Sequence, residues 1–392
     1  MKMCIQNTQR VFFHKYAALF LFVLFTSCEL TVDIDVPFEQ QKLVLNSFFN
    51  TDSVWAATLS ANQHILDTLY EQRIENALIV VYHAGAAVDT LMHLSDGVYR
   101  ADTGKPVPGK SYEIKATAPG YPDVTSHSYI PLPTLITDIQ VTKGASSEGY
   151  PEDVFHVKFQ DDPLVENFYQ IYVEGESDYI DFETAKIRKH RFRLGMATND
   201  PSVRSNEYSG FDGIFIKDVL FTNGNGAISF TTQGQVMDFY SYVIVTIRTL
   251  SKDYYNYKTT GRLQEDISDN PFAQPINVYN NIDNGFGIFA GFSASHYFAG
   301  EPRPRPVITS ISPLRAAPLD TVVISGENFL DVSPHYGSVI FTASGALTYA
   351  SPVRTTPNEI VVLVPRNAIT GKIFVSNASW ITPSDIEFEV IN

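Results

Sequence analysis

Side chains able to support catalysis or metal binding are spread thinly along this sequence. Its nine histidines lack the HExxH spacing that places two imidazoles on one face of a helix, so a zinc enzyme is not expected. The chain also lacks the Gly-x-Ser-x-Gly motif of a serine nucleophile and the glycine-rich loops that bind phosphate groups. We therefore expect no catalytic residue, no metal ligand and no cofactor.

Carboxylates offer a second route to chemistry, because paired acids can act as general acid and base or bind calcium. Three pairs lie close together in the sequence: Asp33 with Asp35, Asp161 with Asp162, and Asp181 with Glu183. None stands in an Asp-x-Asp-x-Asp-Gly calcium loop, and we interpret all three as solvated turn residues. Asn280 to Asn284 could supply oxygens to a calcium ion, with Asx turns as the default interpretation. His296, near Ser293 and Ser295, is interpreted as structural rather than as part of a catalytic triad.

Aromatic side chains are the remaining candidates for ligand contact, because their faces stack on sugar rings and anchor protein partners. The candidates are Trp380 and the neighbouring tyrosines Tyr254 and Tyr255. Trp380 lies in a segment, Asn377 to Pro383, that is typical of a loop, where a large apolar ring has little structural reason to be. The alternative is that Trp380 closes one end of a β-sandwich and is buried.

The N-terminus has the pattern of a targeting segment. Lys2, Arg10 and Lys15 accompany Tyr16 to Phe25, an uncharged apolar run that is too short to span a bilayer. The run ends in Phe-Thr-Ser before Cys28, which is similar to the lipobox of bacterial lipoproteins. We expect a signal peptide over 1–27 and lipidation of Cys28, which would anchor the chain in a membrane through its acyl chains. The alternative is ordinary secretion with Cys28 unmodified.

Composition narrows the classes of function further. Of the two cysteines in 392 residues, Cys4 lies in the expected leader and Cys28 would carry the lipid. The mature protein then has no thiol for a disulfide, a zinc-thiolate site or a nucleophile. The formal net charge is −15 at pH 7, and loss of the basic leader makes the mature chain more acidic. Such a charge repels phosphate backbones and argues against nucleic acid as a partner.

The strand signals predict an all-β protein with three regions. Short apolar or alternating runs, separated by glycine and proline, predict a β-sandwich over 28–133 and a second β-rich region over 134–300. In the second region Ser251 is expected to cap a helix over Lys252 to Gln264. A proline-rich linker over 301–306 then leads to an immunoglobulin-like sandwich over 307–392.

The last region carries residues specific enough to name a family. The stretches that resemble the IPT/TIG immunoglobulin-like domain are Val307 to Pro313, Asp320 to Phe329, Val364-Pro365 and Gly371 to Ile373. Pro313 would end the first strand, and Gly326 would adopt a turn conformation closed to most other residues. These residues maintain a fold and form no site, so the resemblance implies a structural module.

The preceding body also carries recognisable pieces. In chain order they are Cys28 to Leu30, Asp33 to Pro37, Asn76-Ala77, Gly97 to Tyr99, Pro108 to Tyr112, and Asn281 to Phe289. Over about residues 28–297 they resemble a lipoprotein family of Bacteroidota that is catalogued as domain of unknown function 4249. The resemblance implies an envelope lipoprotein that is often associated with TonB-dependent nutrient import, and it implies no assigned reaction.

Together these inferences predict a non-catalytic binding or accessory protein that is anchored in the outer membrane by lipid and faces either the cell surface or the periplasm. Its expected partners are the membrane, a TonB-dependent transporter, and a glycan or other nutrient. Two alternatives remain: a structural envelope lipoprotein without a ligand, and a glycan hydrolase that uses a pair of Asp or Glu carboxylates.

Overall fold

The computed structural model describes residues 41–63, 71–145, 151–201, 203, 208–221, 224–270, 272–329, 339–377 and 379–391. The expected signal peptide 1–27 and the expected lipidation site Cys28 lie outside these residues. Within the described ranges, no helix is long and apolar enough to cross a membrane. Strands arranged in several sheets dominate the described chain, which confirms the predicted all-β, sandwich-type fold.

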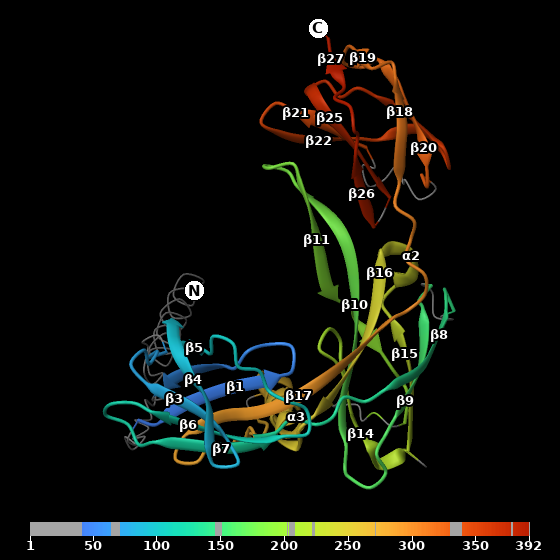
Figure 1. Ribbon diagram of the computed structural model, residues 1–392. Helices are drawn as coiled ribbons and strands as arrows, with labels where there is room; N and C mark the ends of the chain where they lie inside the picture. Colours follow the sequence, from blue (N-terminus) through green and yellow to red (C-terminus); the bar gives the residue numbers. More distant parts are fainter. Residues whose placement is uncertain are drawn as a thin grey trace, which may run out of the picture. The chain divides into compact units, whose positions relative to one another are not determined.

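In its described part, the first region contains strands β1 to β7 (Figure 1). Their buried side chains form one apolar core. The strands are β1 (Leu43–Asn50), β2 (Ala56–Ala61), β3 (Leu78–His83), β4 (Ala86–Ser95), β5 (Val98–Arg100), β6 (Ser111–Thr117) and β7 (Val124–Tyr129). Along β6, Tyr112, Ile114 and Ala116 are buried while the residues between them are partly exposed, as the alternating pattern predicts. Trp55 fills the core and packs edge-on against Tyr112, with ring centroids 4.7 Å apart.

The second region consists of two sheets that share an apolar core. The smaller sheet has the order β12-β15-β9-β8, and the larger contains β13-β14-β10-β16-β17, with β11 paired to β10. The bounds are β8 (Ile136–Thr142), β9 (Val154–Gln160), β10 (Phe168–Asp181), β11 (Lys186–Arg193), β12 (Met196–Ala197), β13 (Tyr208–Ser209), β14 (Gly213–Lys217), η1 (Asp218–Leu220), β15 (Asn225–Thr232), α2 (Val236–Phe239), β16 (Tyr242–Leu250), α3 (Lys252–Ile267) and β17 (Phe286–Phe298). β16 pairs with β10 at one edge and with β17 at the other. Its middle is apolar on both faces because both faces are buried: Val243, Val245 and Ile247 lie in the core shared by the two sheets, and Leu250 lies in the cluster that contains the first turn of α3.

Strand β17 belongs to both regions and joins them into one sheet (Figure 1). Its first half, from Phe286 to Phe292, pairs in parallel with β1, and its second half, to Phe298, pairs antiparallel with β16. We expected this segment to belong to the second region alone, but Ile282 and Phe289 lie in the core of the first. The difference arises because the pairing of β1 with β17 joins segments far apart in the sequence, which no local pattern encodes.

Helix α3 covers the sheet near this junction. Ser251 caps it as predicted, because the Ser251 hydroxyl accepts a hydrogen bond of 3.2 Å from the backbone N–H of Tyr254. The helix continues to Ile267, beyond the predicted end at Gln264. Its first turn packs against side chains of β10, β16 and β17. The capping residue therefore fixes where the helix starts, and the aromatic residues that follow hold it against the sheet.

The β10–β11 hairpin is made of an acidic strand and a basic strand. The register places opposite charges across from one another: Glu174 with Arg193, Glu176 with Arg191, Asp178 with Lys189, and Asp181 with Lys186. Glu176 accepts hydrogen bonds from Lys189 Nζ at 2.7 Å and from Arg191 Nη2 at 3.1 Å. Burial alone would raise the pKa of Glu176, but these two cations outweigh it and hold the pKa below its ordinary value. Charge pairing therefore favours this register in a hairpin whose second strand has little apolar pattern.

In its described part, the third region is a sandwich of two four-stranded sheets, with a short two-stranded sheet of β19 and β27, around a core that contains Phe329, Phe341 and Phe388. Its strands are β18 (Val307–Ser312), β19 (Arg315–Ala316), β20 (Thr321–Glu327), β21 (Val339–Ala343), β22 (Ala346–Ala350), β23 (Pro352–Thr356), β24 (Glu359–Leu363), β25 (Ala368–Asn377), β26 (Trp380–Pro383) and β27 (Glu389–Val390). The pattern of the last strand predicts an inward Ile386, and this is wrong. Ile386 is exposed because it lies in a bend before β27 begins, whereas Phe388 is buried as predicted.

Candidate ligand-binding groove

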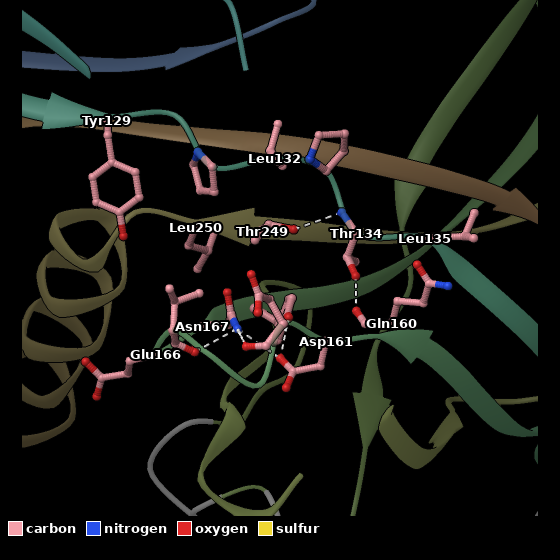
Figure 2. A pocket seen from close by; sticks show the side chains of 15 residues that line it. Tyr129, Leu132, Thr134, Leu135, Gln160, Asp161, Glu166, Asn167, Thr249 and Leu250 are labelled. Carbon is pink, nitrogen blue, oxygen red and sulfur yellow. Dashed lines mark hydrogen bonds between the residues drawn. The ribbon is translucent and has the colours of Figure 1, made fainter. Parts of the chain in front are cut away.

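An open groove of about 520 Å³ lies where the first region passes into the second (Figure 2). One side is the segment from Tyr129 to Leu135, which leaves β7, and the other is the loop from Gln160 to Asn167, which joins β9 to β10. Leu132 and Val165 expose apolar surface here, one on each side. In the sequence, Pro131-Leu132-Pro133 marks only the end of the first predicted region, and the groove is not predicted. A leucine between two prolines is the one local signal of it.

Hydrogen bonds hold the proline-rich side in place. The backbone N–H of Thr134 donates to the Thr249 hydroxyl at 3.2 Å, and the backbone N–H of Gln160 donates to the carbonyl of Leu135 at 2.8 Å. The Thr134 hydroxyl also donates to the carbonyl of Gln160. The prolines on both sides of Leu132 restrict its backbone further. The apolar side chain is therefore presented at the rim by a segment with little conformational freedom left to lose on binding.

Asp161 is the partly buried acid on the opposite side of the groove. Its Oδ1 accepts hydrogen bonds from the Tyr169 hydroxyl at 2.7 Å and from the Asn167 side-chain amide at 3.1 Å. Burial raises the pKa of Asp161, and the nearby carboxylate of Asp218 raises it further. Burial and the hydrogen bond to Asp161 also raise the pKa of Tyr169. These contacts hold the loop together, so Asp161 serves as a structural acceptor.

The other two acids of the loop differ in what they offer a ligand. Asp162 Oδ1 accepts a hydrogen bond of 3.0 Å from the backbone N–H of Leu164, which agrees with the predicted turn role. Glu166 is half exposed and forms an ion pair of 3.1 Å with Lys252 Nζ. No group of three His, Cys, Asp or Glu residues that could hold a metal occurs in the described part of the chain. The groove is therefore a partly apolar surface with hydrogen-bonding groups rather than an assembled catalytic constellation.

Trp380 is buried, which agrees with the alternative interpretation of a buried ring and contradicts that of a loop residue available to a ligand. It begins strand β26 and is 6% exposed. Its indole Nε1 donates to the carbonyl of Arg303 at 2.6 Å, and the guanidinium of Arg305 lies 4.2 Å from the ring centroid. The ring also packs edge-on against Tyr242 of β16, at 5.7 Å between centroids. Its neighbours come from the linker and the second region, so local sequence alone could not show that the ring is covered.

Tyr254 and Tyr255 are likewise buried and unavailable as ligand contacts, with 4% and 3% exposure. The ring of Tyr254 lies 5.1 Å from that of Phe48 on β1, and the ring of Tyr255 lies 4.8 Å from that of Phe168 on β10. Consecutive side chains on a helix point about 100° apart, so one strand could not cover both rings. Both are covered because α3 contacts strands from the two regions at once, an arrangement that the sequence does not reveal.

Two further candidates from the sequence have structural hydrogen bonds. Asp181 Oδ1 accepts hydrogen bonds from the backbone N–H groups of Glu183 and Thr184 at the end of β10, as an Asx turn does. The side-chain amide of Asn281 donates to the carbonyl of Phe289 and its oxygen accepts from the N–H of the same residue. Asn281 therefore joins the first half of β17 to the segment that precedes it through two hydrogen bonds.

Two histidines lie beside hydroxyl groups on neighbouring strands. His296 Nδ1 is 2.9 Å from Thr246 Oγ1, and His156 Nδ1 is 2.8 Å from Ser229 Oγ. Each pair occupies directly opposed positions in an antiparallel ladder. Such positions place side chains about 5 Å apart at Cβ, so these contacts follow from strand register. They agree with the structural interpretation of His296 and call for no catalytic explanation.

One family model matches the sequence over residues 29–297, and its description is "Domain of unknown function (DUF4249)". The chain belongs to the DUF4249 family. The match covers both regions that line the groove and ends within β17, so the third region lies outside it. The Bacteroidota origin and the IPT/TIG resemblance go beyond what this match shows. No curated protein matches the sequence.

Solved structures resemble this DUF4249 chain only distantly. A crystal structure with a xylogluco-oligosaccharide is 11% identical at a TM-score of 0.21, over 87% of this chain and 58% of that one. The plexin A4 extracellular region is 10% identical at a TM-score of 0.19, over 90% of this chain and 34% of that one. The Yersinia pseudotuberculosis adhesin InvE is 10% identical at a TM-score of 0.17, over 79% of this chain and 73% of that one. The chain spans only part of the length of the first two, and scores this low carry no argument about function.

Proposed function

We propose that the mature chain is a lipid-anchored protein of the outer membrane that binds a partner or nutrient without catalysing a reaction. The observation that carries the proposal is the position of the family match, which begins at residue 29, directly after Cys28. A family domain that starts one residue after a lipobox-like cysteine fits a mature protein whose first residue is that cysteine. Lipidation there would hold the chain at the membrane through several acyl chains.

The groove supports the binding part of the proposal. Leu132 and Val165 expose apolar surface across it, and hydrogen bonds fix the backbone that carries Leu132. A preformed, partly apolar cavity with a few polar groups is the usual form of a site that binds a ligand or a partner side chain. We propose a TonB-dependent transporter as the partner and a glycan or other nutrient as the ligand.

The third region would then act as a spacer or contact module, and we propose that it is an IPT/TIG immunoglobulin-like domain of a Bacteroidota lipoprotein. Its two-sheet sandwich and apolar core support this assignment. A purely structural envelope lipoprotein remains the alternative if the groove binds nothing. A hydrolase based on Asp161 and Asp162 is the weaker alternative, because both carboxylates accept hydrogen bonds that shape their own loop.

Replacement of Cys28 by serine is expected to abolish labelling of the protein by a fatty-acid analogue in growing cells, because serine offers no thiol for the thioether. Cys4→Ser is the matched control, since Cys4 lies in the expected leader and should leave the label unchanged. The label is read by gel fluorescence after immunoprecipitation. Equal labelling of wild type and Cys28→Ser would show that the chain is not lipidated at this residue.

A further inference from the structure

Arg248 of β16 is a largely buried cation that forms no ion pair with any described carboxylate. Its Nη1 donates to Gln170 Oε1 at 3.2 Å and to the Tyr254 hydroxyl at 3.4 Å. Its Nε is buried without a hydrogen-bond partner. Arginine stays charged at every physiological pH, so the cost of removing it from water is not relieved by loss of a proton. The position therefore lacks a counter-charge.

Aromatic rings compensate for part of this cost. The guanidinium carbon of Arg248 lies 4.3 Å from the ring centroid of Phe292 and 5.0 Å from that of Tyr172. Such contacts stabilise a cation, yet they provide no acceptor for its N–H groups. No described residue accepts a hydrogen bond from the outer nitrogen, Nη2, and Nη2 is not one of the buried polar atoms that lack a partner. Gln170 and the Tyr254 hydroxyl hold the guanidinium group in place. Its remaining edge can therefore donate hydrogen bonds to an acceptor from outside the chain.

A second guanidinium approaches the same tyrosine from the other side of β10. The guanidinium carbon of Arg193 lies 4.0 Å from the ring centroid of Tyr172. Arg193 forms a long ion pair of 3.8 Å with the exposed Asp212, and its Nη1 also donates to the Asp212 carbonyl at 3.5 Å. Glu174 lies opposite Arg193 in the strand register without forming an ion pair with it. Strand register puts both arginines on the face of the sheet that carries Tyr172, on the strands either side of β10.

We propose that Arg248 and Arg193 form an anion subsite beside Tyr172 that takes the oxyanion group, a carboxylate or a sulfate, of a small ligand. A guanidinium fork matches two oxygens of such a group, and Gln170 and Tyr254 already fix the orientation of Arg248. The bound anion supplies the counter-charge that Arg248 lacks. The subsite rests on the proposed binding function and narrows it to an acidic nutrient, such as an acidic or sulfated sugar. Because the chain as a whole is strongly acidic, these two arginines would form a local cationic site on it.

The test is calorimetric titration of the purified full-length protein in detergent with sodium acetate and, separately, sodium sulfate, at ionic strength held constant with sodium chloride. We expect saturable binding of at least one probe, and the better probe identifies the source of the oxyanion. Arg248→Gln should weaken binding at least tenfold, about 1.4 kcal/mol or more. Arg193→Gln should weaken it severalfold. Arg315→Gln, an exposed arginine of the third region, is the matched control and should bind as wild type does.

Arg248→Lys keeps the positive charge but loses the paired N–H donors of the guanidinium group, so it should fold and bind the anion with intermediate affinity. This variant keeps the test informative if Arg248→Gln does not fold. Absence of saturable binding by wild type, or equal loss of affinity in Arg315→Gln, would overturn the subsite. The titration depends neither on the lipid nor on a transporter. A negative result here therefore leaves the proposed function standing, and loss of the transporter leaves the subsite standing.

Discussion

Gly287→Ala is expected to destabilise the protein by more than about 4 kcal/mol, a large share of the stability of a typical domain. Gly287 lies in β17 with φ at +113°, a backbone conformation that residues with a Cβ rarely adopt. An added Cβ would also overlap the carbonyl oxygen of Leu45 on β1 and lie 2.9 Å from Asn46 Oδ1. Both strands are paired at this position, so neither can move away without breaking the ladder.

Guanidinium unfolding followed by circular dichroism measures this effect. Gly261→Ala is the matched control, because Gly261 lies within α3 and the closest atom to its added Cβ is 3.9 Å away. Alanine in a helix is favoured over glycine by about 0.5–1 kcal/mol, so the control should be slightly more stable than wild type. An unfolding midpoint of Gly287→Ala equal to that of wild type would contradict the parallel pairing of β1 with β17.

Trp380→Ala should lower the free energy of unfolding by about 3–5 kcal/mol, the usual cost of removing a large buried ring. The ring is buried against Tyr242 and Arg305, and its N–H satisfies the carbonyl of Arg303. Trp380→Phe keeps much of the volume and loses the hydrogen bond, so its loss should be smaller, about 1–2 kcal/mol. The measurement is the same denaturant titration.

Val353→Ala provides the control for Trp380, because Val353 is exposed on the third region and should change stability by less than about 0.5 kcal/mol. Unchanged stability of Trp380→Ala together with weakened partner binding would contradict the buried position and restore the ring as a surface anchor.

Local signals in the sequence are sufficient for the elements that depend on local physics. Ser251 predicts the start of α3 because capping involves only the next few residues. The alternation around Ile114 predicts which face of β6 is buried, because a strand has a period of two. The apolar middle of β16 predicts a strand that is buried on both faces. In each case the information lies within about ten residues.

Features that depend on distant partners could not be predicted in the same way. β11 has the composition of a solvated segment, and it forms a strand because the acidic residues of β10 lie opposite its cations. β17 contributes to two regions because β1 and β16 pair with its two halves. The groove combines the segment around Leu132 with a loop near Asp161 and the end of β16. Trp380 is covered by residues from outside its own region.

The central claim, that this is an anchored accessory protein that binds through the groove, is tested most directly by purification from outer membranes in mild detergent followed by mass spectrometry. We expect wild type to recover a TonB-dependent transporter. Leu132→Glu, which puts a charge on the apolar rim, should lose it, while Val353→Glu, an equally exposed position on the third region, should retain it. Repeated failure of wild type to recover any such transporter, or its recovery at wild-type yield by Leu132→Glu, would contradict the account.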